Sequence, residues 1–180
     1  MRQLISVLIF LMIYSCIPVR IAPNIKGDKI VKAKRFKRDL PRNYGFVFED
    51  PKDANEFYNF INMKFKLDYI DVESNVPIKV EEETYFLSFY EREKVTKTIN
   101  LLPILVDAKR ESNGNDPIME DVHTSRNGKW YLILIVLDSE MNDGLSPNYQ
   151  KKDKILSYLR NLQHEYLTTH NYLESYLRSD

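Results

Sequence analysis

Residues 130–137 read Trp-Tyr-Leu-Ile-Leu-Ile-Val-Leu, and this apolar run decides the fold. Polar residues do not alternate with apolar ones here, so neither face of the strand that it predicts can be exposed to water. A strand that is buried on both faces lies in the interior of a sheet. We therefore predict that residues 130–137 form the central strand.

Segments on either side of this run predict further strands, because they are rich in β-branched and aromatic residues and are bounded by turn formers. Residues 84–90 and 95–102 predict one hairpin. Asn127-Gly128 suits a type I′ turn, and it predicts a second hairpin that ends in the central strand. The expected strands are 44–49, 78–80, 84–90, 95–102, 122–125 and 129–138.

Two amphipathic helices are expected to cover the sheet. The first follows Asp50-Pro51, because Asp50 can cap a helix and proline suits the first helical position; the apolar spacing then predicts a helix over 51–66. The second begins at Ser146-Pro147 and carries an apolar stripe. The sequence thus predicts an α+β fold with a mainly antiparallel sheet and two principal amphipathic helices. The stripe of the second helix is Ile155, Leu159, Leu162 and Tyr166.

The N-terminal residues have the pattern of a secretory signal. Arg2 precedes the apolar run 4–14, and Ser15-Cys16 follows it. A run of eleven residues is too short for a transmembrane helix, which needs about 20 apolar residues. A positive end followed by roughly 7–15 apolar residues is typical of a cleaved signal peptide. Cys16 is the only cysteine in the chain.

Residues 1–16 resemble the signal peptide of bacterial lipoproteins, in which the cysteine after a small residue receives the lipid and becomes the new N-terminus. The resemblance implies lipidation of Cys16 and attachment to a membrane by several acyl chains. The segment 17–20 has no acidic residue, which implies an outer-membrane lipoprotein facing the periplasm. The Lys-, Asn-, Tyr- and Ile-rich remainder resembles lipoproteins of Bacteroidota-type bacteria. The alternatives are an ordinary secretory signal with an incidental cysteine, or a buried helix of a cytosolic protein.

Charge is distributed unevenly along a chain whose formal net charge is zero. Residues 20–42 hold nine basic and two acidic residues, whereas 43–180 hold 16 basic and 24 acidic residues. We expect a signal peptide at 1–15, a lipid-anchored basic linker at 16–42 that contains an edge strand, and one α+β domain at 43–180. One possibility is that these cations bind anionic lipid headgroups, or a partner that is negatively charged like those headgroups. The other is that they face the acidic residues of the domain itself.

Sequence motifs for several classes of chemistry are missing. Neither glycine-rich phosphate-binding motif occurs, nor does the G-x-S-x-G turn of serine hydrolases. A cysteine nucleophile is excluded if Cys16 carries the lipid. The spacing of His123, His164 and His170 does not suit a metal site.

Two acidic segments remain as candidates for cation binding. Residues 138–144 resemble a calcium loop, but the glycine falls at position seven rather than six and the distal glutamate is missing. The acidic run 81–83 is expected to form a solvated face, to bind a basic partner, or to contact the basic residues of segment 20–42. We expect no catalytic, cofactor or metal residues, no nucleic-acid partner, and a non-enzymatic binding or structural role in the cell envelope. The alternative is a hydrolase acting on cell-wall or lipid material.

Overall fold

A computed structural model describes residues 16–53, 55–100, 112 and 124–169. These residues divide into two compact units. The first contains 16–23, 93–100, 112 and 124–129; the second contains 24–53, 55–92 and 130–169. The expected signal peptide, 1–15, lies outside the described residues, as do His123 and His170.

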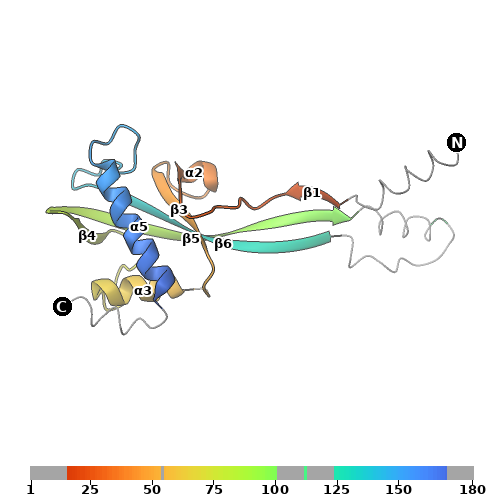
Figure 1. Ribbon diagram of the computed structural model, residues 1–180, viewed down its shortest axis with the longest axis horizontal. Helices are drawn as coiled ribbons and strands as arrows, with labels where there is room; N and C mark the ends of the chain where they lie inside the picture. Colours follow the sequence, from red (N-terminus) through yellow and green to blue (C-terminus); the bar gives the residue numbers. More distant parts are fainter. Residues whose placement is uncertain (1–15, 54, 101–111, 113–123, 170–180) are drawn as a thin grey trace. The chain divides into compact units, whose positions relative to one another are not determined.

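Strands and helices of the described residues form an α+β fold (Figure 1), as the sequence predicts. The strands make one sheet in the order β1-β5-β6-β3-β2, with β4 paired to β5. The pairs β1–β5, β2–β3, β3–β6 and β4–β5 are all antiparallel. The elements are β1 (Cys16–Arg20), β2 (Lys29–Lys32), α2 (Ala33–Phe36), β3 (Tyr44–Asp50), α3 (Glu56–Phe65), β4 (Val76–Val80), β5 (Glu83–Asn100), β6 (Thr124–Leu137) and α5 (Lys152–Thr168).

The central position of residues 130–137 is confirmed. β6 lies between β5 and β3, and residues 131–136 are all buried. Because side chains alternate along a strand, they supply both faces of the sheet with apolar groups. Leu132, Leu134 and Val136 join the larger core, and Tyr131, Ile133 and Ile135 join a smaller core on the opposite face.

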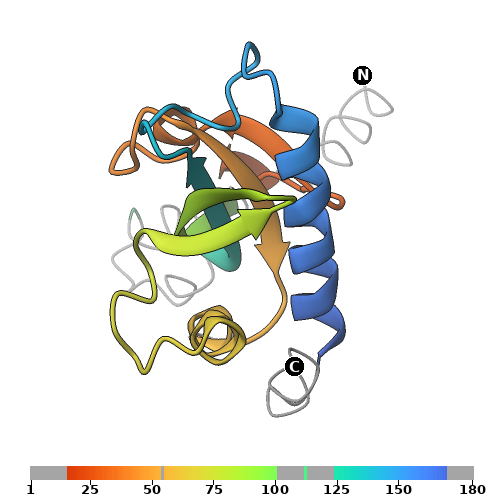
Figure 2. The same ribbon diagram turned by 90° about the vertical axis from the view of Figure 1, so that its left-hand side faces the viewer.

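The two amphipathic helices cover the larger core of the second unit. α3 lies near the C-terminal end of α5 (Figure 2), where Lys64 forms an ion pair with Glu165 at 2.7 Å. Tyr166 of α5 makes edge or tilted ring contacts with aromatic residues of α3 and β3. The predicted stripe of the second helix is buried throughout: Ile155, Leu159, Leu162 and Tyr166.

The short helix α2 covers the smaller core. Ala33 and Leu40 are buried against it, and the ring of Phe36 contacts that of Tyr131 edge-on at 5.3 Å. Gly45 of β3 leaves room for Ile133 of β6 in this core, because a Cβ on Gly45 would lie 2.7 Å from Cγ2 of Ile133. Residues 33–40 are therefore held on the sheet by three inward side chains.

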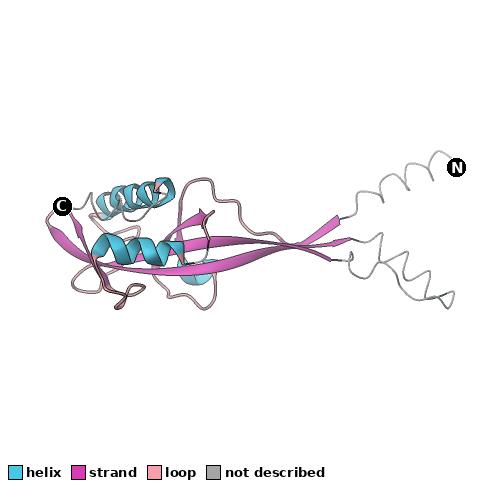
Figure 3. Cartoon of the chain, turned by 90° about the horizontal axis from the view of Figure 1, so that it is seen from below, coloured by secondary structure: helices cyan, strands magenta, loops and turns pink. Residues whose placement is uncertain are grey.

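Both predicted hairpins are wrong, because the strands continue through the expected turns (Figure 3). β5 is one strand from Glu83 to Asn100, and its hairpin partner is β4, joined by the turn Glu81-Glu82. β6 passes through Asn127-Gly128, and Gly128 lacks the positive φ that a type I′ turn requires. A Cβ on Gly128 would overlap the Glu93 carboxylate, which lies at the end of a flexible side chain and would have to move aside.

Both helices begin later than predicted. α3 begins at Glu56 after Asn55, which has a left-handed conformation and makes no side-chain cap bond. Asp50 does not cap this helix, because its carboxylate accepts hydrogen bonds from the Tyr166 hydroxyl and the Lys52 amide. α5 begins at Lys152, after a turn that follows Ser146-Pro147.

The N-terminal part of the expected linker is a strand in the first unit. β1 pairs with β5 in a register that sets Cys16 opposite Asn100. After a register shift near Arg20, the Ala22 amide donates to Thr96 Oγ1 at 3.0 Å. No helix in the described ranges has the length and apolarity that crossing a membrane requires.

The remainder of the expected linker belongs to the second unit. β2 pairs with β3 from Lys29 to Lys32 and lies at the end of the strand order. This strand within the expected linker ends at Lys32, and α2 begins at Ala33. The boundary expected at residue 43 falls within this unit.

Candidate functional site

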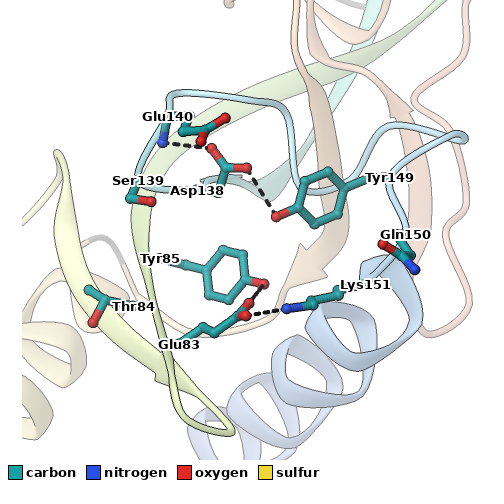
Figure 4. A pocket seen from close by; sticks show the side chains of 9 residues that line it. All are labelled: Glu83, Thr84, Tyr85, Asp138, Ser139, Glu140, Tyr149, Gln150 and Lys151. Carbon is teal, nitrogen blue, oxygen red and sulfur yellow. Dashed lines mark hydrogen bonds and ion pairs between the residues drawn. The ribbon is translucent and has the colours of Figure 1, made fainter.

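A pocket of about 470 Å³ lies where the β4–β5 turn meets the loop after β6 and the residues that precede α5 (Figure 4). Its polar lining includes three carboxylates, two tyrosine hydroxyls and an ammonium group. These groups come from Glu83, Asp138, Glu140, Tyr85, Tyr149 and Lys151. The pocket therefore brings together residues from segments far apart in the sequence.

Glu83 is already engaged by two partners in this pocket. It forms an ion pair with Lys151 and accepts a hydrogen bond from the Tyr85 hydroxyl at 2.9 Å. The hydrogen bond from Lys151 is the main reason that the pKa of Glu83 lies below its usual value. Burial raises the pKa of Tyr85 far above that of a free tyrosine. At neutral pH Glu83 is ionised and Tyr85 keeps its proton.

Asp138 is engaged in the same way by its own loop. Its Oδ1 atom accepts the amides of Glu140 and Asn142 at 2.9 and 2.8 Å. Its Oδ2 atom accepts the Asn142 side-chain amide at 3.0 Å and the Tyr149 hydroxyl at 3.1 Å. Burial alone would raise the pKa of Asp138, but these hydrogen bonds lower it below the usual value.

Glu83 and Asp138 do not form an acid–base pair. Glycoside hydrolysis needs one carboxyl group whose pKa is raised so that it can donate a proton. The pKa values of Glu83 and Asp138 are both lowered, so neither holds a proton at neutral pH. The described residues also contain no group of three or more His, Cys, Asp or Glu side chains placed to hold a metal ion.

The acidic run 81–83 is located on the β4–β5 turn and is partnered by α5 and the residue before it. Glu81 pairs with Lys154 at 2.6 Å, and Glu83 with Lys151. The partners of Glu81 and Glu83 in these pairs are therefore not the cations of residues 20–42. His164, the histidine within the described ranges, is exposed on α5.

A basic surface lies over the smaller core, and we call residues 33–42 the basic cover. Ala33, Phe36 and Leu40 face the sheet, Lys37 is half-buried, and the other cations of the cover are exposed. Four of these cations are exposed and form no ion pair with any described residue: Lys34, Arg35, Arg38 and Arg42.

The acidic residues in and near the basic cover are neutralised by cations from elsewhere in the second unit. Asp39 pairs with Arg92 at 2.7 Å, and the hydrogen bond from Arg92 lowers the pKa of Asp39. Asp28 pairs with Arg160 at 2.9 Å. The positive charge of the cover is consequently not cancelled by its own acids. The sequence predicted the excess of cations, but only the fold shows these partners.

Comparison with known proteins adds no assignment, since a scan of protein-family models and searches of curated proteins and solved structures all found no match. Three features of this chain bear on its function. They are Cys16 at the start of β1, the pocket in which Glu83 is paired with Lys151, and the exposed basic cover.

A buried carboxylate lies at the opposite end of α5 from the pocket. Asp50 is 5% exposed, and both of its oxygens lie 3.0 Å from the Tyr166 hydroxyl. Lys52 donates to the carbonyls of Tyr166 and Thr169 at 2.5 and 2.6 Å, which satisfies the last turn of α5. Sequence reasoning missed this cluster, because its partners are more than a hundred residues apart.

We expect Asp50 to make stability depend on pH in the acid range. Burial raises the pKa of Asp50 in the folded protein above 3.8. The protonated form is therefore favoured by folding, and its contribution to stability is complete below about pH 4 and is lost as pH rises through the folded pKa. Urea midpoints measured across this range should show Asp50→Asn gaining stability relative to the native protein as pH rises. Parallel curves for the two proteins would contradict this assignment.

Proposed function

We propose that this protein is a lipid-anchored protein of the bacterial cell envelope with a binding or structural role rather than a catalytic one. The observation that carries the proposal is the position of its only cysteine. Cys16 directly follows a positive end, an apolar run and a small residue, which is the arrangement found in lipoprotein signals. The absence of acidic residues at 17–20 supports an outer-membrane location facing the periplasm.

The site geometry favours the binding role over the hydrolase that the sequence left open. Glu83 and Asp138, two of the three carboxylates that line the pocket, are held in their ionised forms by neighbouring donors. By contrast, Lys34, Arg35, Arg38 and Arg42 are exposed and have no ion-pair partner among the described residues. A surface of this kind suits recognition of a negatively charged partner.

Lipidation at Cys16 would attach the acyl chains to the end of a paired strand. β1 begins at Cys16, which lies opposite Asn100 of β5. The proposed anchor would therefore continue directly into a paired strand of the first unit.

Replacing Cys16 by Ala should abolish incorporation of labelled palmitate and leave the signal peptide uncleaved or release the protein from the membrane fraction. The assay is labelling and fractionation of cells that produce the full chain. Ser15→Ala is the matched control, since it preserves a small residue before the cysteine and should remain labelled and membrane-bound. Equal labelling and processing of Cys16→Ala and the native protein would refute the proposal.

A further inference from the structure

The basic cover has a fixed shape because its inward side chains hold it on the sheet. Ala33 and Leu40 are buried, and Phe36 contacts Tyr131. The cations that alternate with these residues are therefore presented by an ordered backbone and not by a free tail. A polar surface of this kind needs no folding step before it meets a partner.

The basic cover keeps its net positive charge in the folded protein. Its acidic residue, Asp39, is paired with Arg92 from β5, so Asp39 does not neutralise the exposed arginines beside it. Glu81 and Glu83 pair with Lys154 and Lys151 at the β4–β5 turn. These ion pairs leave Lys34, Arg35, Arg38 and Arg42 available to an external anion.

We propose that the basic cover docks the second unit on a membrane surface by binding the phosphate headgroups of anionic phospholipids. This inference rests on the proposed envelope function, because a lipid on Cys16 would keep the cover close to such a surface. Fully extended, the chain from Cys16 to Ala33 spans at most about 60 Å. One anchor combined with a polybasic surface is a known route to stable membrane attachment.

The test compares full chains that carry Cys16→Ala, so that lipidation does not contribute. Each chain is titrated with vesicles of phosphatidylcholine, and with vesicles of equal parts phosphatidylcholine and phosphatidylglycerol. The apolar run 4–14 contributes to both partition coefficients, and their ratio isolates the response to anionic lipid. Each cation near the surface contributes about fivefold, so Lys34→Gln with Arg35→Gln should lower the ratio about 25-fold.

Two further variants test alternative explanations. The first tests whether any cation on the protein has the same effect, and the second tests whether binding requires a particular side-chain geometry. Lys79→Gln with Lys152→Gln removes the same charge outside the cover and should leave the ratio near that of the parent chain. Lys34→Arg with Arg35→Lys keeps the charge and should also keep the ratio, because headgroup attraction does not require one side-chain geometry. In about 1 M salt, where screening acts within about 3 Å, the ratio of the parent chain should fall towards one.

The proposal is overturned if phosphatidylglycerol does not increase partitioning, or if the cover pair and the control pair change the ratio equally. It is also overturned if exchanging Lys34 and Arg35 for one another's residue type abolishes binding, which would indicate a shaped site for another partner. Thermal melting of each variant checks that the exposed substitutions leave the fold intact. Because all arms lack the lipidated cysteine, their outcome is independent of whether Cys16 is lipidated.

Discussion

Replacing Ile135 by Asp is expected to unfold the second unit. Ile135 is 3% exposed in the smaller core, and its neighbour Leu134 is fully buried in the larger one. An unpaired charge at either position costs several kcal/mol, whereas a whole domain has about 5–15 kcal/mol of stability. Leu134→Asp should therefore have the same effect from the opposite face of β6.

Circular dichroism during thermal melting shows whether each variant is folded and at which temperature it unfolds. Lys79→Asp is the matched control, because Lys79 is an exposed strand position beside the buried Ile78. The control should melt cooperatively at nearly the native temperature. A soluble Ile135→Asp variant that melts like the control would show that the smaller core is open to water, contrary to the structure.

Replacing Tyr166 by Ala is expected to have the second largest effect. The ring contacts Phe48, Phe57 and Phe60, and the hydroxyl binds the buried Asp50. Removing a large aromatic side chain from a core costs about 3–5 kcal/mol. The variant also leaves the Asp50 carboxylate without this donor, so we expect a loss at the upper end of that range.

Tyr166→Phe separates the hydroxyl from the ring. It keeps the aromatic packing and removes the donor to Asp50, which should cost about 1–3 kcal/mol in urea unfolding. A double-mutant cycle with Asp50→Asn should give a coupling energy, because the two groups are in direct contact. If Tyr166→Phe is as stable as the native protein, the hydrogen bond from the Tyr166 hydroxyl to Asp50 does not contribute to the free energy of unfolding.

The elements predicted correctly are those whose pattern follows from burial. Residues 130–137 must be buried on both faces because they lack alternation, and the stripe of α5 must face a core because of its spacing. The hairpin at Asn127-Gly128 was wrong, because a local preference for a turn was overridden by continued pairing along β6. Tertiary pairing commonly overrides a preference of this size.

Contacts between distant residues explain what the sequence could not predict. Asp50 has a good capping pattern for a helix, but its carboxylate binds Tyr166, 116 positions away. The charge excess of residues 20–42 was evident, yet the pairing of Asp28 with Arg160 spans 132 positions. No periodicity or spacing reports such a pair, so the exposed cations of the basic cover could be assigned only from the fold.

The proposed anchor is tested most directly by mass spectrometry of the N-terminal peptide of the protein isolated from bacterial membranes. We expect a chain that begins at Cys16 and carries acyl groups on that residue. A mature chain with an unmodified Cys16, or one that retains residues 1–15 in full, would contradict it.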